Sequence, residues 1–368
     1  MPLRVLIAPD KFKGTLTAHA AASAIARGWR QARPGDCLTV LPMSDGGDGF
    51  GAVLGELMNA RARQMRTVDA AHRPRRALWW YVQSSKTAII DSAEVIGLAL
   101  MAGKFHPFQL DSFGLGEVLR AAVKARAARA IIGVGGSATN DGGFGLARAL
   151  GWEFFDCELQ ELTEWWQLHQ LAHIRRPKQA LRLRATVAVD VDNPLLGPKG
   201  CSQIYGPQKG LRPEDFALAE KCLGQLASVL KAQHGVDGAR IPGAGAAGGL
   251  GFGLMAFAGA ELESGFEIFA REAHLDERIA AADLVITGEG RIDRQTYMGK
   301  GVGQIARRCA HQRVPCLAVA GAILGPEHAC EWFAQTRALT EITDAQGAFS
   351  KPARHLKQLA WQLAKATR

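Results

Sequence analysis

The chain has 368 residues and a net charge of +9, with 48% hydrophobic and 21% charged residues. This length suggests two domains of ordinary size, and the composition excludes an intrinsically disordered chain. The 42 glycines gather in clusters rather than in a repeat, which excludes a collagen-like fibre and favours tight turns or anion-binding loops. The 7 cysteines form no C-x-x-C pair, which argues against a disulfide scaffold and fits a reducing cytoplasm.

Two stretches bear on membrane and nucleic-acid partners. Residues 241–260 carry no charge, but seven of them are glycines, which predicts a buried loop and helix rather than a membrane span. Six arginines between residues 61 and 76 precede Trp79, Trp80 and Tyr81 and could contact a nucleic-acid strand. Because no nucleic-acid motif is present, we expect a small anionic substrate, with neither nucleic acid nor membrane as partner.

Apolar periodicity predicts strands alternating with helices at both ends of the chain. The predicted strands cover residues 4–8, 38–41, 283–287, 314–320 and 337–342. The predicted helices cover residues 18–33 (after the cap candidate Thr17), 49–61, 301–311 and 352–366. Such alternation is typical of a parallel sheet with helices on both faces.

The middle of the chain is less regular. Its expected strands and helices cover residues 87–92, 130–134 and 186–191, and residues 115–126 and 213–233, respectively. We therefore predict a flavodoxin-like parallel-sheet domain formed by both chain ends, residues 1–65 and 277–368. It is interrupted by a second, mixed α/β domain, residues 66–276.

A flavodoxin-like strand order, 2-1-3-4-5, has its topological switch point between the first strand and the strand that ends at Thr287. Asp10 and Lys11 would then lie beside residues 288–290. Ligands of such sheets bind beyond the carboxyl ends of the strands at this point. These residues are therefore candidates for a binding site.

Glycine-rich loops join a predicted strand to a predicted helix at two places, residues 42–49 and 133–143, and both contain Asp-Gly-Gly. Glycines let the backbone approach a ligand, and the amides at a helix start attract phosphate or carboxylate. A neighbouring aspartate can hold magnesium or accept a hydroxyl proton. Helix caps in tight turns are the alternative interpretation.

Further loops carry glycines or charged groups. Residues 243–249 match G-x-G-x-x-G but lack a preceding strand, so an anion loop or a packing site is favoured over a dinucleotide site. Residues 288–293, with Thr296 and Lys300, offer acids and cations in what we expect to be one loop. Residues 190–194 place acids after an apolar strand, which suits metal binding, base catalysis or a turn cap.

Six motifs, in this order along the chain, resemble those of the type-1 glycerate kinase family, the bacterial glycerate kinases that phosphorylate the 2-hydroxyl. They are residues 8–16, 45–49, 133–143, 190–195 with 206–210, 243–249, and 287–293 with Gln295, Thr296, Gly299 and Lys300. The resemblance runs almost end to end.

The resemblance implies an ATP-dependent glycerate kinase, with Mg²⁺ as cofactor, that transfers the γ-phosphoryl group of ATP to D-glycerate and gives 2-phosphoglycerate and ADP. It also implies an active site in the cleft between the two domains. A kinase for another small hydroxy acid, a nucleotide-binding protein without turnover, a dinucleotide-dependent oxidoreductase and a homo-oligomer stay open as alternatives.

The resemblance suggests Lys11, Asp45, Asp190 and Lys300 as catalytic residues. Lys11 and Lys300 would stabilise phosphate charge, and Asp45 and Asp190 would serve as magnesium ligands or base. Arg291 would hold the glycerate carboxylate. The other expected binding residues are Asp10, Lys13, Ser44, Gly46, Gly47, Gly135, Gly136, Ser137, Asn140, Asp141, Asn193, Lys209, Gly245, Gly248, Gly288, Glu289, Gly290, Asp293 and Thr296.

The chain departs from the family pattern in two places that concern its loops. Asp48 stands where a glutamate is usual. Residues 156–182 lack the usual glycines and contain Trp165 and Trp166, so the local loop shape should differ.

Overall fold

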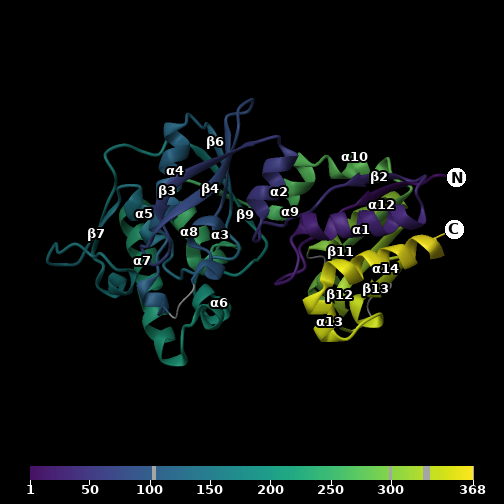
Figure 1. The fold of residues 1–368 in the computed structure, drawn as a ribbon. Helices are drawn as coiled ribbons and strands as arrows, with labels where there is room; N and C mark the ends of the chain where they lie inside the picture. The colour runs from purple at the N-terminus through teal and green to yellow at the C-terminus, as the bar shows by residue number, and fades with distance from the viewer. Residues whose placement is uncertain (102–104, 298–300, 326–331, 368) are drawn as a thin grey trace. The chain divides into compact units, whose positions relative to one another are not determined.

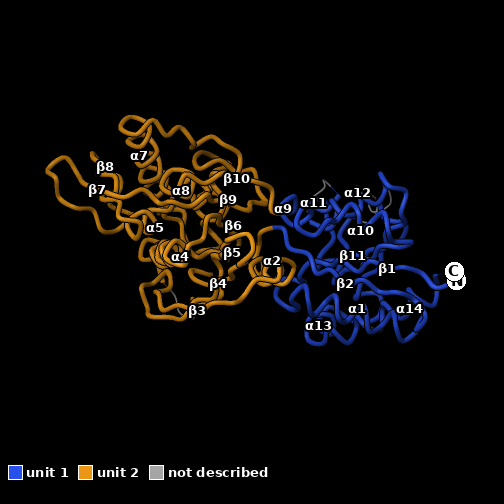
Figure 2. Tube along the Cα trace, turned by 90° about the horizontal axis from the view of Figure 1, so that it is seen from above, with its two compact units in different colours: residues 1–45, 266–368 blue, residues 46–265 orange. Residues whose placement is uncertain are grey.

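A computed structural model describes residues 1–101, 105–297, 301–325 and 332–367. The chain forms two compact units (Figure 2): residues 1–45 with 266–368, and residues 46–265. The first contains a parallel sheet built from both chain ends, and the second contains a mixed sheet. The predicted fold class is therefore confirmed.

The sheet of the first unit has the order β13-β12-β11-β1-β2, and all neighbouring strands are parallel. Its strands, visible in Figure 1, are β1 (Arg4–Ile7), β2 (Cys37–Val40), β11 (Leu284–Ile292), β12 (Cys316–Ile323) and β13 (Gln335–Ala338). Numbered within this unit, the order is 2-1-3-4-5. The predicted flavodoxin-like order is confirmed, with the switch point between β1 and β11.

Two helices of the first unit, at the two ends of the chain, pack closely against each other at a glycine. The helices are α1 (Ala18–Ala32), α9 (Gly265–Glu272), α10 (Leu275–Ala280), α11 (Arg294–Tyr297), α12 (Val302–Gln312), α13 (Ala345–Ser350) and α14 (Pro352–Ala366). Thr17 caps α1 by accepting a hydrogen bond from the Ala20 amide at 3.2 Å. A Cβ on Gly28 would lie 2.1 Å from the Lys357 carbonyl oxygen of α14, so α1 and α14 approach closely only because residue 28 has no side chain.

The second unit contains a six-stranded sheet with the order β10-β9-β6-β5-β4-β3. Strands β10, β9, β6 and β5 run parallel to one another. β4 pairs antiparallel with β5, and β3 pairs antiparallel with β4. The strands are β3 (Arg61–Val68), β4 (Pro74–Val82), β5 (Thr87–Asp91), β6 (Arg129–Gly133), β9 (Arg184–Val189) and β10 (Glu261–Ser264). All three strands predicted in the middle of the chain are present.

Helix α2 (Phe50–Leu57) covers one face of this second sheet, which corrects the predicted domain boundary. The Trp80 ring of β4 lies where Cβ atoms on Gly51 and Gly55 would stand, 2.2 Å and 2.7 Å from its nearest atoms. Phe50 packs in the same way against Gly133 of β6. The limits expected at residues 65 and 276 therefore fall at 45 and 265, because α2 buries its apolar side chains on β4 to β6.

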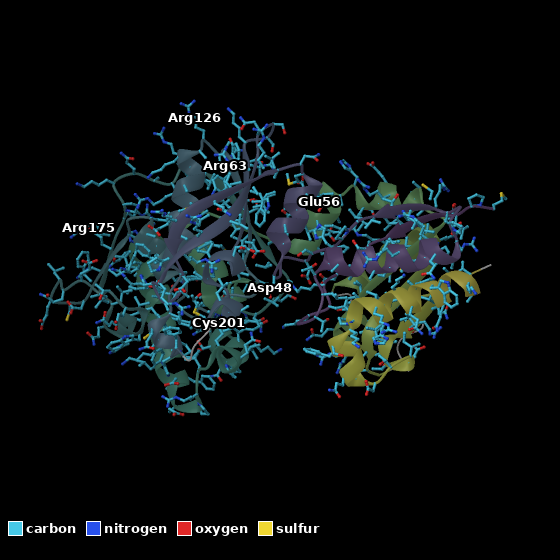
Figure 3. The ribbon with its side chains drawn as sticks, in the orientation of Figure 1. Asp48, Glu56, Arg63, Arg126, Arg175 and Cys201 are labelled. Atoms are coloured by element: carbon cyan, nitrogen blue, oxygen red, sulfur yellow. The ribbon has the colours of Figure 1, made fainter. Side chains whose placement is uncertain are left out.

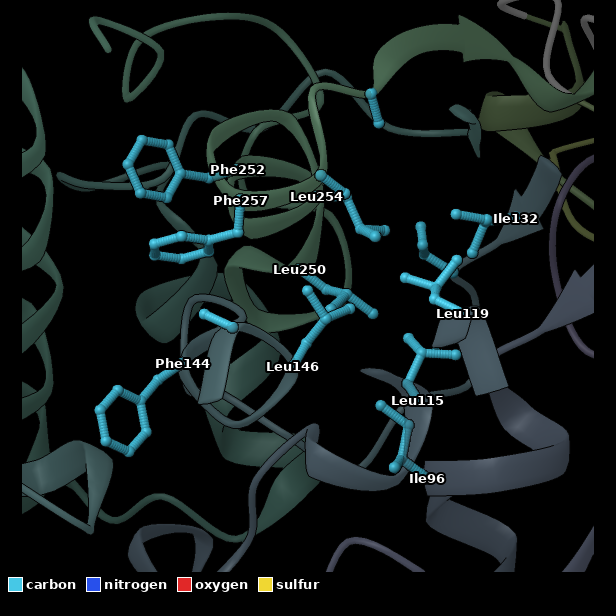
Figure 4. Close-up of a cluster of buried hydrophobic side chains, with 14 of the residues drawn as sticks. Ile96, Leu115, Leu119, Ile132, Phe144, Leu146, Leu250, Phe252, Leu254 and Phe257 are labelled. Atoms are coloured by element: carbon cyan, nitrogen blue, oxygen red, sulfur yellow. The ribbon is translucent and has the colours of Figure 1, made fainter. Parts of the chain in front are cut away.

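The opposite face of the sheet forms the main core of the second unit. Trp79, Tyr81, Ile90 and Ile132 belong to this core. Figure 4 shows Ile132 near Leu119 of a covering helix. The helices of this unit are α3 (Ala93–Ile96), α4 (Phe113–Lys124), α5 (Phe144–Ala149), α6 (Cys201–Lys209), α7 (Phe216–His234) and α8 (Ala246–Ala258). Within the described ranges, no helix combines the length and apolar character needed to cross a bilayer.

The arginine-rich segment forms the hairpin β3–β4, which the sequence did not predict. Trp79 and Tyr81 are buried, and the Arg63 guanidinium stacks on them at 5.4 Å and 4.5 Å from the ring centroids. Arg126 and Arg175 point away from the second unit (Figure 3). The aromatic rings are thus core residues rather than a platform for stacking bases.

Two further differences concern the divergent stretch and one strand boundary. Strand β7 (Glu153–Phe155) directly precedes the divergent stretch and pairs with β8 (His173–Arg175) inside it, with the 3₁₀ helix η3 (Trp165–Gln170) between them. The Trp165 indole donates a hydrogen bond to the Pro107 carbonyl at 3.0 Å, so it anchors this stretch to the core. The strand expected at 337–342 ends at Ala338 and continues as the 3₁₀ helix η6 (Leu339–Glu341).

The α1–α14 contact makes a stability prediction. Alanine at position 28 gains helix propensity of about 1 kcal/mol but clashes with the α14 backbone, and overpacking costs about 1–3 kcal/mol. We expect Gly28→Ala to lower the free energy of unfolding, measured in urea. Gly224→Ala, inside α7 where a Cβ would meet only Leu196 at 3.9 Å, is the control and should be neutral or stabilising. A Gly28→Ala protein as stable as wild type contradicts the packing argument.

Candidate functional site

The first group of candidate residues lies at the carboxyl ends of β1 and β11. The Asp10 amide donates a hydrogen bond to the Gly288 carbonyl at 2.8 Å. A Cβ on Gly290 would lie 3.0 Å from the Lys13 amide nitrogen, so this glycine lets the two segments approach. The prediction that Asp10 and Lys11 lie beside residues 288–290 is confirmed.

Three carboxyl groups share this end of the sheet. Asp10 is 7% exposed, and its pKa is raised well above the usual range by burial and by the nearby Asp45 carboxylate, with the Lys11 ammonium acting in the opposite direction. Burial also raises the pKa of Glu289 to about 7, although the Thr296 hydroxyl donates to its Oε1 at 2.7 Å. Asp45 and Asp293 raise the Glu289 pKa further. Burial and the neighbouring carboxylates therefore disfavour the charged forms of Asp10 and Glu289, and a cation bound nearby would favour them.

Residues next to the three carboxyl groups differ in whether they already have a hydrogen-bond or ion-pair partner. The Ser44 hydroxyl is buried and, among the described residues, has no hydrogen-bond partner. The Arg291 side chain is 64% exposed and pairs with Asp293 at 3.1 Å. Arg291 is therefore accessible to a ligand but already carries one carboxylate partner.

Residues 288–292 are part of a strand, which corrects the predicted loop. β11 continues to Ile292, and Gly288, Glu289 and Arg291 pair with β12. Glycines make this pairing compact, since a Cβ on Gly288 would lie 2.2 Å from the Val319 carbonyl oxygen. Lys300, expected to act with this segment, lies outside the described residues.

The second group lies in the second unit, where two predicted glycine loops meet. The Gly135 amide donates to the Gly46 carbonyl at 3.1 Å, and a Cβ on Gly135 would lie 2.5 Å from the Gly47 Cα. Gly136 has φ +72°, and a Cβ there would overlap the Asp48 carboxylate (labelled in Figure 3). The two loops that contain Asp-Gly-Gly thus pack backbone to backbone.

The third glycine loop joins this group through Lys209. The Lys209 Nζ donates to the Thr139 carbonyl at 2.5 Å and to the Ser137 Oγ at 3.1 Å, and the Ser137 hydroxyl donates to the Ala247 carbonyl at 3.0 Å. Burial lowers the pKa of Lys209 to about 8. Gly248, with φ +76°, lies against Thr139 and Asn140 of the loop 133–143 and against the Lys209 Nζ. The predicted G-x-G-x-x-G segment follows turns, not a strand, and its glycines pack against neighbouring backbone.

Other predicted residues of the second unit support its loops. Asp141 is fully buried and accepts hydrogen bonds from the Ser112 amide and hydroxyl and from the amides of Gly143 and Gly145. The Gly245 amide donates to the Asn193 carbonyl at 2.8 Å. The Asn140 side chain donates to the Ser202 hydroxyl at 2.9 Å, while its Oδ1 is buried and has no partner among the described residues.

Asp190 lies just beyond the carboxyl end of β9 in the second unit. Its charge, with that of Asp192, contributes to a raised pKa of Tyr205, so these acids lie near the tyrosine ring. The Tyr205 hydroxyl donates to the Asn193 Oδ1 at 2.5 Å. Asp190 therefore belongs to a different unit from Asp45, the other expected metal ligand.

Asp91 is a buried carboxylate that the sequence interpretation missed. It ends β5, accepts hydrogen bonds from the amides of Gly49, Gly51 and Ala93, and so caps α2 and α3. Burial raises its pKa to about 7. An acid at the end of the apolar run 87–91 was the available signal, the same one that singled out Asp190.

Known proteins similar to this chain identify its family. The sequence model described as the glycerate kinase family matches residues 5–368. The chain belongs to the glycerate kinase family. The resemblance inferred from the six motifs is thereby confirmed.

Individual relatives agree with this assignment. The chain is 39% identical over 326 residues to a protein named glycerate kinase from Bacillus subtilis, covering 87% of this chain and 85% of the relative. It is 38% identical over 329 residues to glycerate 2-kinase from Escherichia coli, covering 87% and 86%. A crystal structure provisionally described as that of glycerate kinase 2 from Salmonella typhimurium LT2 matches with a TM-score of 0.84 at 32% identity, covering 100% and 98%.

The buried Asp91 predicts a pH-dependent stability. Between about pH 4 and 7 the unfolded carboxyl loses its proton while the folded one keeps it, so this residue makes stability fall as pH rises. The slope is at most about 1.4 kcal/mol per pH unit. We expect Asp91→Asn to remove this contribution in urea unfolding across that range, whereas Asp237→Asn, at an exposed ion pair, should not. Equal slopes for wild type and Asp91→Asn contradict the prediction.

Proposed function

We propose that this protein is a glycerate 2-kinase, which transfers the γ-phosphoryl group of ATP to the 2-hydroxyl of D-glycerate and gives 2-phosphoglycerate and ADP. The observation that carries the proposal is the cluster of Asp10, Lys11, Asp45 and Glu289 at the switch point of the first unit, in a chain of the glycerate kinase family. The name of the relative from E. coli, glycerate 2-kinase, supports the position of the transferred phosphate.

The charge on these carboxyls fits a magnesium ion. Besides burial, the Asp45 and Glu289 carboxylates raise the pKa of Asp10, and Asp45 also raises that of Glu289. A divalent cation would offset this repulsion with the oxygen ligands that Mg²⁺ prefers. Across residues 1–101, 105–297, 301–325 and 332–367, no three acidic, histidine or cysteine side chains form a complete metal cluster. We infer that Asp45, and Asp190 from the second unit, serve as ligands and that phosphate and water oxygens complete the shell.

When bound, Mg²⁺ would neutralise charge on the β- and γ-phosphates. The Lys11 ammonium lies close enough to Asp10 to lower its pKa, so it is present at this site. We propose that it also offsets the phosphate charge. We assign Lys11 and Lys300 to stabilising the transferring phosphoryl group. Phosphoryl transfer depends mainly on position and charge, so these cations would supply much of the rate enhancement.

The glycine loops suit the remaining task of holding anionic oxygens. Gly46, Gly47, Gly135 and Gly136 expose backbone without side chains, next to the start of α2. Amides at such a position favour phosphate or carboxylate. We assign this group to the nucleotide phosphates.

The acceptor hydroxyl needs a base and an orientation. As its oxygen forms the new bond to phosphorus and the bond to ADP breaks, its proton passes to a carboxylate. Asp45 and Asp190 are the candidates for this base. A kinase for another small hydroxy acid would use the same groups. A nucleotide-binding protein without turnover would use the same glycine loops but would not need so many acids beside them.

A coupled assay tests the proposal directly. With ATP, Mg²⁺ and D-glycerate, we expect ADP formation and a product that resolves as 2-phosphoglycerate. Product at the 3-position, turnover only with a different hydroxy acid, or ATP binding without turnover would each replace the proposal with one of its alternatives.

Substitution of the aspartates assigns their roles. We expect Asp45→Asn to lower kcat about 100-fold or more, as removal of a base or charge partner does. Asp283→Asn is the control, because Asp283 pairs with Arg4 at the exposed amino-terminal end of β11. For Asp190→Asn, a loss of kcat of about tenfold or less with unchanged magnesium affinity would remove Asp190 from the catalytic residues.

A further inference from the structure

Lys209 is a buried cation at the end of α6. The residue is 6% exposed, and Gly210, with φ +100°, ends the helix directly after it. Its ammonium has three N–H donors, and two of them have acceptors: the Thr139 carbonyl and the Ser137 hydroxyl. Both acceptors are neutral.

No carboxylate of the described residues forms an ion pair with Lys209. Burial lowers the Lys209 pKa, while the Cys201 thiol and the Asp141 carboxylate act in the opposite direction. The Asp141 oxygens are already occupied by Ser112, Gly143 and Gly145. An ammonium buried without a counter-ion costs several kcal/mol of free energy, so a lysine in this position needs a further partner.

The surroundings of the ammonium are built from small and uncommitted groups. A Cβ on Gly248 would lie 2.9 Å from Nζ, so residue 248 leaves this side of the ammonium without a side chain. On the loop 133–143, the Thr139 Oγ1 and the Asn140 Oδ1 are buried and have no hydrogen-bond partner among the described residues. The end of α6 therefore supplies a charged donor, Lys209. Residues 137–140, which it contacts, supply two polar atoms without partners, the Thr139 Oγ1 and the Asn140 Oδ1.

We propose that Lys209 is the counter-ion for an anionic oxygen of the substrate, and specifically for the carboxylate of the three-carbon acid, with Ser137 beside it. The proposal rests on the proposed function and deepens it. One ammonium matches the single charge of a carboxylate, whereas phosphates usually engage several cations and amides. Thr139 and Asn140 would suit the hydroxyl groups of the same acid. Arg291, the earlier candidate, already pairs with Asp293 and is largely exposed.

The test removes the charge from the ligand and from the protein in turn. Dissociation constants are measured by calorimetry for D-glycerate, for its uncharged amide D-glyceramide, and for ATP. Wild type should bind D-glycerate more tightly than D-glyceramide by roughly 100-fold, the loss expected when one partner of a buried charge pair is removed. Lys209→Met should bind D-glycerate and D-glyceramide equally weakly. Lys209→Arg should recover part of the preference for D-glycerate.

Controls distinguish the other roles. Lys221→Met, at an exposed lysine of α7, should leave all three constants unchanged. If Lys209→Met weakens ATP instead of D-glycerate, the anion is a phosphate and the carboxylate assignment is overturned. If it weakens every ligand alike and the preference for the charged acid persists, Lys209 only braces its two loops and the proposal fails.

The proposed function can fail separately. If wild type binds no D-glycerate, the anion site is tested with malonate and with inorganic phosphate as stabilisers of thermal unfolding. A rise of Tm in wild type that is absent in Lys209→Met supports the site without that substrate. Equal behaviour of the two proteins with both anions overturns it.

Discussion

Parallel pairing of β1 with β11 is the constraint on which the first unit depends. The register Ile7↔Ile286 joins segments far apart in the chain, and the Thr287 hydroxyl donates to the Ala8 carbonyl at 2.7 Å across 279 residues. Because parallel strands end at the same edge, the segments that follow β1 and run through β11 must meet there. Asp10 and Glu289 become neighbours for this reason.

Burial then gives these neighbours their chemical character. Carboxyl groups removed from water next to one another hold protons more tightly, so this end of the first unit attracts cations. The second unit contains the opposite case, a buried ammonium at Lys209 with neutral partners. The proposed reaction between an anionic nucleotide and an anionic acid, assisted by a divalent cation, would use both kinds of site.

Glycine provides the geometry that brings backbone to these charges. Gly46, Gly135 and Gly248 each stand where a Cβ would meet neighbouring backbone at 3.0 Å or less. Their shared property is close approach of main chains, which side chains would prevent. The clusters of glycine therefore combine packing with ligand access, and Asp91 and Asp141 hold the loops by accepting amide hydrogen bonds.

Local sequence determined the strands and helices at both chain ends, the flavodoxin-like order and the family, because apolar periodicity and motif order are written along the chain. It also singled out Asp10 and Lys209 as candidates. Only tertiary structure decided that α2 belongs to the second unit, that residues 288–292 extend a strand, and that Trp79 is a core residue. The reason is physical: the burial of a side chain and its partners depends on segments distant in sequence, such as Gly51 against Trp80, which no local pattern contains.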